Sequence, residues 1–235
     1  MNQAVLSADE VGVSYGGLRA VDGVSLTVAG GELHGVIGPN GAGKSTFMDA
    51  LSGRCKLSAG SVSLGGEDVT GRSVQWRRRN GMSRSFQRTS VFPGLTVRDQ
   101  LEFVADLTHE TELDLVIEAL GLGDFLDVTC SSISYGDQRS VDIAMALIGR
   151  PTVVLLDEPG AGLTKEESAR MLDHIRGLCR EREVAAVLVE HDVEGVFRVC
   201  DTITVLDRGV VIASGLPADV RADPQVISAY LGSEA

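Results

Sequence analysis

Short apolar stretches separated by glycine-rich turns occupy the first third of the chain. Three of them, Val11–Tyr15, Val24–Val28 and Val62–Leu64, have the length and surroundings of β-strands, and we expect a small antiparallel sheet. A fourth stretch, Leu33–Ile37, predicts a buried strand. It leads into a glycine-rich loop and then into a helical pattern over Phe47–Ser52.

The pattern changes from strands to helices in the middle of the chain. Apolar residues recur at intervals of three and four positions between Leu113 and Leu120, where Gly121 follows as a helix stop. A second helix is expected from about Gly136 to Ile148. We therefore predict a helical subdomain over residues of about 88–150.

Strand and helix patterns alternate in the last third. Strands are predicted at Val153–Leu156, Ala185–Val189 and Thr202–Leu206, and helices at Lys165–Arg182 and Val193–Val199. This alternation is typical of a parallel α/β sheet. We expect an α/β core with an N-terminal antiparallel β subdomain and an inserted α-helical subdomain.

The length and composition fit one folded unit. The chain has 235 residues, of which 43% are hydrophobic, so we expect a single domain over 1–235. Its formal net charge of −12 argues against nucleic acid as a partner. A local basic run, Arg77–Arg79 with Arg84 and Arg88, is interleaved with Trp76 and Phe86, and we interpret it as a solvated loop face.

Cysteines and targeting signals bound the cellular setting. The four cysteines form no CxxC pair and no metal-ligand spacing, so we expect reduced thiols, as in a cytosolic protein. The first eleven residues do not have the pattern of a signal peptide, and no apolar run is long enough to span a bilayer. Any membrane association is therefore expected to come through a partner.

The strongest chemical motif follows the strand Leu33–Ile37. It fits the pattern of a phosphate-binding loop, in which glycines let backbone N–H groups surround phosphate oxygens at the start of a helix. Lys44 is expected to reach the β- and γ-phosphates, and the Ser45 hydroxyl to bind Mg²⁺. The loop consists of Gly38, Pro39, Asn40, Gly41, Ala42, Gly43, Lys44, Ser45 and Thr46.

A second motif is the apolar strand Val153–Leu156, which ends in Asp157 and Glu158. Beside a phosphate-binding loop, Asp157 can hold Mg²⁺ through water, and Glu158 can orient and polarise an attacking water. Adjacent strand residues point to opposite faces, so the turn after the strand must bring both carboxylates toward one site. Together the two motifs predict ATP hydrolysis with Mg²⁺.

Along nearly its whole length the chain resembles the ATPases of ABC transporters. The segment Ile133–Gln138, called the signature segment below, stands where that family usually has Leu-Ser-Gly-Gly-Gln, at the start of a helix. Ser134 and the amides near Gly136 can form a second anion site there. In the family this site caps the γ-phosphate bound by the opposite subunit, so the resemblance implies a dimer that encloses ATP.

Three further residues match the family's pattern. Tyr15, before two glycines, matches the aromatic residue that stacks on adenine. Gln87 matches the glutamine that contacts Mg²⁺ and the transport subunit. His191 matches the switch histidine that contacts the γ-phosphate, and the resemblance therefore implies catalytic roles for Glu158, His191, Gln87 and Lys44.

Short stretches narrow the resemblance to one branch. Tyr135 in the signature segment, the triplet Glu190-His191-Asp192 and the ending Ala229-Tyr230-Leu231-Gly232 are similar to ATPases of branched-chain amino acid importers and their urea and amide relatives. The chain departs from the usual pattern in the signature segment and in the dimer-interface loop. The departures are Asp137 for Gln, Ser140 for Arg, Thr164 for Asp or Asn, and a shorter stretch over Ala105–Glu112.

The resemblance implies an ATP-hydrolysing subunit of an importer for branched-chain amino acids or similar small polar solutes. Membrane permease subunits and a second ATPase subunit are the implied partners, with a solute-binding protein involved indirectly. The implied place is the cytoplasmic face of the membrane, as a peripheral subunit. A non-hydrolysing regulatory subunit and a soluble ABC ATPase outside transport remain as alternatives.

Overall fold

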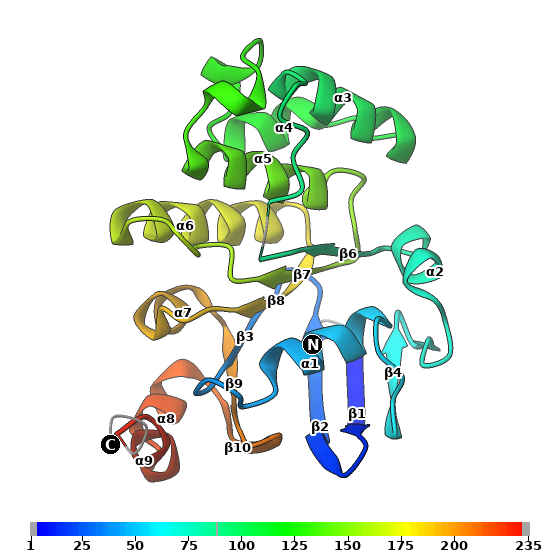
Figure 1. Cartoon of the computed structure of the whole chain (residues 1–235), viewed down its shortest axis with the longest axis vertical. Coiled ribbons are helices and arrows are strands. Elements are labelled where there is room, and N and C mark those ends of the chain that lie inside the picture. The colour runs from blue at the N-terminus through cyan, green and yellow to red at the C-terminus, as the bar shows by residue number, and fades with distance from the viewer. Residues whose placement is uncertain (1–3, 88, 232–235) are drawn as a thin grey trace.

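The computed structural model describes residues 4–87 and 89–231, and it contains two sheets with helices packed around them (Figure 1). The smaller sheet is antiparallel where its strands pair, with the order β2-β1-β4-β5. The turn-rich strand pattern near the N-terminus therefore folds as predicted. Its strands are β1 (Ala4–Tyr15), β2 (Leu18–Ala29), β4 (Ala59–Leu64) and β5 (Glu67–Asp68).

The larger sheet has the order β10-β9-β3-β8-β7-β6. Only β10 runs antiparallel to its neighbour, whereas β9, β3, β8, β7 and β6 are parallel to one another. The carboxyl ends of these five strands consequently lie along one edge. The strands are β3 (Leu33–Ile37), β6 (Met82–Ser85), β7 (Val153–Asp157), β8 (Ala185–Val189), β9 (Thr202–Asp207) and β10 (Val210–Gly215).

The helix α1 lies between the two sheets, and α5 and α6 cover the other face of the larger one (Figure 1). In Figure 1, α1 lies beside β1 and β2, and α3, α4 and α5 gather at the opposite end beyond α6. The helices are α1 (Lys44–Ser52), α2 (Val74–Arg79), α3 (Val97–Thr108), α4 (Leu113–Ala119), α5 (Tyr135–Leu147), α6 (Lys165–Glu181), α7 (Val193–Val199), α8 (Pro217–Ala222) and α9 (Pro224–Leu231). Two short 3₁₀ turns, Gly123–Phe125 and Cys130–Ser132, precede α5.

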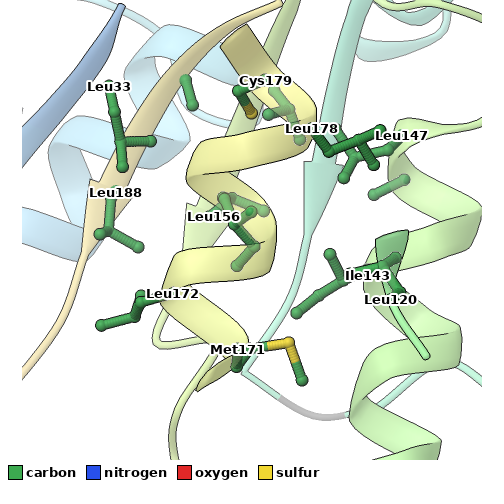
Figure 2. Close-up of a cluster of buried hydrophobic side chains, with 14 of the residues drawn as sticks. Leu33, Leu120, Ile143, Leu147, Leu156, Met171, Leu172, Leu178, Cys179 and Leu188 are labelled. Atoms are coloured by element: carbon green, nitrogen blue, oxygen red, sulfur yellow. The ribbon is translucent and has the colours of Figure 1, made fainter. Parts of the chain in front are cut away.

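Successive residues of the parallel strands fill two different cores. In β7, Val154 and Leu156 face the helices α5 and α6, while Val153 and Leu155 join the core around α1 and the antiparallel sheet. Figure 2 shows the first core, where Leu172 and Leu178 of α6 lie among Leu156 and other buried aliphatic side chains. The sheet is therefore buried on both faces, which explains the continuous apolar stretches in the sequence.

The observed elements agree with the α/β prediction in order and type. The bounds of β3, β8 and α7 coincide with the predicted ones, and the predicted helices at 136–148 and 165–182 shift by one residue. The helices α3, α4 and α5 lie within residues 88–150. The division into one domain over 1–235 stays a prediction.

The interpretation of the basic run as a solvated loop face is wrong for Arg77 and Arg84. Arg77 is 1% exposed, and its guanidinium donates to backbone carbonyls that include those of Leu51 and Val69. Arg84 lies in β6 and contacts two carboxylates. Carbonyls and acids from distant segments pair with both guanidinium groups, so neither cation is buried unpaired, although Arg84 Nε has no hydrogen-bond partner in the described part of the chain. Arg88 lies outside the described residues.

Candidate active site

The predicted site residues meet at the carboxyl edge of the parallel sheet. The phosphate loop, Gly38–Thr46, follows β3, and Asp157 and Glu158 stand at the end of β7. Gln87 comes two residues after β6, and His191 two residues after β8. Since these strands are neighbours, four separate loops converge on one place, which is the common location of ligands in open α/β sheets.

The phosphate loop depends on glycine where the chain is most crowded. At Gly38 (φ 149°), an added Cβ atom would lie 2.0 Å from the carbonyl oxygen of Leu206. At Gly43 (φ 103°), it would lie 2.5 Å from the carbonyl oxygen of Ala20. Only glycine fits such positions, and the result is a tight loop in which Gly43 is the N-cap residue of α1.

Lys44 is the first residue of α1 and lies beneath the loop. Its side chain is buried, and Nζ donates to the carbonyl oxygens of Gly38 at 2.6 Å and Pro39 at 3.1 Å. Burial lowers the pKa of Lys44, whereas the nearby charges of Glu158 and Asp157 act to raise it. The ammonium group of Lys44 is therefore held at the phosphate loop by backbone carbonyls of the loop itself.

Glu158 occupies an unusual backbone conformation at the end of β7. Its φ of 50° is in the left-handed region, and its N–H donates to the carbonyl of Val189 at 2.8 Å. This turn explains how two successive carboxylates serve one site, as the sequence requires. Non-glycine residues adopt such a φ rarely and at an energetic cost, often at functional positions.

Two side chains hold the carboxylate of Glu158. Gln87 Nε2 donates to Oε2 at 2.7 Å, and His191 Nε2 lies 2.8 Å from Oε1. Glu158 is 8% exposed, while the His191 side chain is 55% exposed. The three predicted residues therefore form one connected group, with Glu158 fixed between an amide and an imidazole.

Asp157 lies behind this group and pairs with a residue that the sequence did not identify. Arg84 Nη2 contacts Asp157 Oδ2 at 3.0 Å, and Arg84 Nη1 contacts Asp49 Oδ1 at 2.6 Å and Ser52 Oγ at 2.9 Å. Arg84 thereby connects β6 and β7 to α1.

The phosphate loop and Glu158 open into one cavity of about 680 Å³. This volume lies within the usual range for sites of small ligands and cofactors. Tyr15, at the turn between β1 and β2, lines the cavity with a side chain that is 54% exposed. The lining residues are Tyr15, Leu18, Arg19, Ala20, Asn40, Gly41, Ala42, Gly43, Lys44, Ser45, Thr46, Glu158, His191 and Arg208.

Arg208 is a cation in this cavity that the sequence interpretation missed. It lies in the turn between β9 and β10, where Arg208 and Gly209 have φ angles of 47° and 86°. Positive φ at both central residues is typical of a tight hairpin turn. The turn is bonded to the phosphate loop, since Gly209 N–H donates to the Ala42 carbonyl at 3.0 Å. The Asp-Arg-Gly turn signal could have placed it.

The signature segment lies elsewhere in the same chain. Ser134 and Gly136 line a separate cavity of about 260 Å³ at the N-terminus of α5, which includes neither the phosphate loop nor Glu158. The single chain therefore does not unite its two predicted anion sites. Ser134 caps α5 by accepting from Asp137 N–H at 3.1 Å.

The Asp137 carboxylate does not point away along α5 but lies against Ser134. Its Oδ2 accepts the Ser134 hydroxyl proton at 2.6 Å, so the carboxylate folds back over the first turn. The partial positive charge of the helix N-terminus favours this position of a carboxylate. The hydroxyl that was expected to meet a phosphate is therefore engaged by Asp137.

Within the described part of the chain, every helix is too short or too polar to cross a lipid bilayer.

Comparisons with known proteins identify the family of the chain. A family model described as "ABC transporter" matches residues 21–161, and one described as "Branched-chain amino acid ATP-binding cassette transporter" matches residues 210–235. The high-affinity branched-chain amino acid transport ATP-binding protein BraF of Pseudomonas aeruginosa is 32% identical over 99% of both chains. The lipopolysaccharide export system ATP-binding protein LptB of Haemophilus influenzae is 33% identical over 98% of both.

A solved structure has the same arrangement of elements. It is the ADP conformation of an ATP-binding cassette of an ABC transporter, with a TM-score of 0.87 and 26% identity over 98% of this chain and 100% of that one. The family-model match at residues 21–161 spans the phosphate loop, the β7 carboxylates and α5. The chain therefore belongs to the ABC transporter family, as one of its ATP-binding ATPase subunits.

Proposed function

We propose that this chain hydrolyses ATP at Glu158 to drive an importer of branched-chain amino acids or similar small polar solutes. The main supporting observation is the position of Glu158, which is held between Gln87 and His191 and opens into the same cavity as the phosphate loop. A water beside this carboxylate would be oriented for attack on a γ-phosphate held at Lys44.

The other residues of the cavity divide the work of binding. The backbone amides of the phosphate loop, from Gly38 to Thr46, and the Lys44 ammonium would hold the phosphates, while Tyr15 at the cavity rim would stack on adenine. His191, which is exposed, would contact the γ-phosphate and report its presence to Glu158. These roles are proposed for each residue on its position and on its match to the family motifs.

The residues around Asp157 fit a magnesium ion. Ser45, Asp157 and Gln87 offer hydroxyl, carboxylate and amide oxygens, the hard donors that Mg²⁺ prefers together with water. Arg84 binds Asp157 through Oδ2, so Oδ1 is the oxygen we assign to the cation or to its water. When bound, the ion would neutralise phosphate charge. The protein supplies its oxygen ligands at the start of α1 and at the ends of β6 and β7.

We further propose that two subunits face each other and enclose ATP between them. Ser134 and Gly136 lie in a cavity apart from the phosphate loop, so a second chain is the simplest source of the missing anion site. ATP would then lie between one subunit's Lys44 and the other's signature segment. The partner subunit can be a second copy of this chain or a related ATPase.

We infer the membrane partners from the family, because relatives such as BraF are ATP-binding proteins of transport systems. Permease subunits would carry the solute, and a solute-binding protein would act through them, so this chain would lie at the cytoplasmic face as a peripheral subunit. BraF supports a branched-chain amino acid as the solute, while LptB, at similar identity, belongs to an export system. We therefore base the proposal of a branched-chain amino acid also on the match of residues 210–235 to the model of branched-chain amino acid ATP-binding cassette transporters.

The two alternatives have less support. A non-hydrolysing regulatory subunit does not need Glu158, Gln87 and His191 bonded into one group, as they are here. A soluble ABC ATPase that acts on nucleic acid is disfavoured by the net charge of −12.

The test is ATP turnover by the chain, alone and with its permease subunits, compared with Glu158→Gln. The substitution removes the polarising carboxylate and leaves the phosphate loop intact. We expect ATP affinity to stay within about threefold, turnover to fall below a hundredth of wild type, and an ATP-stabilised dimer to appear in sizing chromatography. Wild-type turnover in this variant would exclude Glu158 as the catalytic carboxylate, and an inactive wild-type chain with its permease would favour the regulatory alternative.

A further inference from the structure

Gln87, Glu158 and His191 are called the hydrolytic group below. A fully buried arginine on α5 contacts the segments that bear two of them, Gln87 and Glu158. Arg139 lies in the second turn of α5, five residues after Ser134, and is 0% exposed. Its guanidinium donates to backbone carbonyls of two other segments. Nε donates to Pro159 at 3.1 Å, and Nη2 to Asp157 at 3.2 Å and Glu158 at 2.5 Å.

The remaining nitrogen of the same group reaches the loop that holds Gln87. Arg139 Nη1 donates to the carbonyl of Phe86 at 2.6 Å and lies 3.5 Å from Asp142 Oδ2. Asp142, one turn later on α5, accepts the N–H of Ser90 through Oδ1 at 3.0 Å. The Arg139–Asp142 pair therefore holds the chain on both sides of Gln87.

All five N–H donors of the guanidinium have an acceptor, and four of the five acceptors are backbone carbonyls. The planar guanidinium forms a fork of N–H donors that fixes the directions of these hydrogen bonds as well as their lengths, which the ammonium group of a lysine cannot do. Since a buried cation is costly to desolvate, its presence here calls for a reason beyond packing. That reason lies in the segments it joins, which bear Gln87, Glu158 and the signature segment.

We propose that Arg139, with Asp142, is a positioning residue that couples the signature end of α5 to Gln87 and Glu158 of its own chain. Ser134 is the N-cap of this continuous 13-residue helix, so a rigid shift of the helix at Ser134 would carry Arg139 with it. Nucleotide bound by the opposite subunit would contact Ser134, and Arg139 would bring Glu158 and Gln87 of this subunit into register. Each site would thus sense the other through one guanidinium. This inference rests on the proposed ATPase dimer.

The test uses Arg139→Lys, which keeps the positive charge and removes the fork. We expect kcat to fall at least tenfold, while KM and the ATP dissociation constant change less than threefold, because the phosphate loop is untouched. Arg77→Lys is the matched control. Arg77 is equally buried and also donates to carbonyls, but at the C-terminal end of α1. We expect it to lower the melting temperature by a similar amount and to leave kcat within threefold of wild type.

A double substitution separates positioning from general destabilisation. If Arg139 acts through Gln87, Arg139→Lys with Gln87→Ala should be no slower than the slower single variant. Should Arg139→Lys not fold, Asp142→Asn replaces it, since it keeps an acceptor for Ser90 and weakens the pairing, with an expected kcat loss of at least threefold. Three results would each overturn the coupling. The first is a normal kcat in a folded Arg139→Lys or Asp142→Asn variant. The others are a double variant whose loss of kcat is the product of the two single losses, and a loss of kcat in Arg77→Lys equal to that in Arg139→Lys. If wild type turns over ATP and Glu158→Gln does not, such results leave the proposed function intact.

Discussion

Ser134 and Asp137 bind each other at the first turn of α5, and this pair decides how the signature segment meets a phosphate. The Asp137 N–H donates to Ser134 Oγ, and the Ser134 hydroxyl donates to Asp137 Oδ2. The hydroxyl must leave the carboxylate before it can donate to a nucleotide. The carboxylate also places a negative charge beside the expected position of the phosphates.

We therefore predict that Asp137→Gln raises the ATPase activity of the dimer. At about 8 Å and an effective dielectric constant near 20, repulsion costs on the order of 2 kcal/mol per unit of phosphate charge. This exceeds the stabilisation of about 0.3–1 kcal/mol that a carboxylate gains at a helix N-terminus. Steady-state kcat/KM for ATP should rise about tenfold or more.

The matched control is Glu167→Gln. Glu167 is also a capping carboxylate in the first turn of a helix, but it forms its capping hydrogen bonds with Thr164, the N-cap residue of α6. The substitution removes one negative charge from the cavity that Ser134 and Asp137 also line, and it leaves the hydrogen bond between Ser134 and Asp137 in place. A change of less than threefold in Asp137→Gln, or an equal gain in Glu167→Gln, would mean that the Asp137 carboxylate does not limit closure.

Residues whose motifs are local could be identified from the sequence, and those whose partners are distant could not. The phosphate loop and the pair Asp157-Glu158 can be identified from the spacing of their residues and from the apolar strands before them. Arg84 and Arg139 do not, because their acceptors lie up to 73 positions away along the chain. A charged residue with distant acceptors has the same local pattern as a solvated one, so Arg84 was misinterpreted.

At the scale of elements, hydrophobic periodicity predicted what is buried on a regular period. The strands β7 and β8 contain the continuous apolar runs Val153–Leu156 and Ala185–Val189, β3 is equally buried although it contains His34, and α7 has clear ends. The strand β6, with the sequence Met-Ser-Arg-Ser, was missed. It is an edge strand whose buried serines and arginine carry no apolar signal, and its ladder with β7 defines it.

One buried ion pair joins three of these elements and should control acid stability. Glu110, in the link between α3 and α4, contacts Arg182 after α6 and accepts the N–H of Gly149 before β7. Burial by itself would raise the pKa of Glu110. The hydrogen bonds from Arg182 and from the backbone N–H groups of Glu112 and Gly149 outweigh burial and lower it to about 2.

The sign of the pH effect follows from this lowered pKa. A carboxyl group with a folded pKa below its unfolded value of 4.5 contributes stability above that value, and the contribution is lost as the pH falls toward 2. Glu110→Gln should therefore lower the free energy of unfolding by about 3 kcal/mol at pH 7. Urea unfolding of both proteins should give a difference that shrinks steadily below pH 4.5.

The control is Glu102→Gln, which removes an exposed carboxylate that pairs with Arg98 on α3. Exposed pairs of this kind contribute about 0–1 kcal/mol, so its effect should be small at every pH. A constant difference between wild type and Glu110→Gln from pH 7 to pH 3 would show that packing, and not the charge of Glu110, stabilises this junction.

At the scale of the whole molecule, four of the exposed large apolar side chains in the described part of the chain belong to α3 and to the segment just before it. Phe103 and Leu107 of α3 are 60% and 66% exposed and stand one helical turn apart, and Phe92 and Leu95 precede that helix with exposures of 58% and 43%. Clustered exposed apolar side chains on a soluble domain often mark a protein partner. The same segment begins shortly after Gln87, so a partner bound there would lie near the hydrolytic group.

We predict that this face binds the permease. Phe103→Asp should leave ATP turnover of the isolated chain within twofold of wild type, because Phe103 is not among the residues that line the cavity around the phosphate loop. Binding should fail, since a charge would be buried against an apolar surface without a partner. The measurement is co-purification with the permease subunits, together with their stimulation of ATP turnover. Ile227→Asp, on α9 and 47% exposed, is the control and should behave as wild type in both assays. If Phe103→Asp co-purifies and is stimulated fully, the permease must dock elsewhere, and the link from Gln87 to the membrane would need another route.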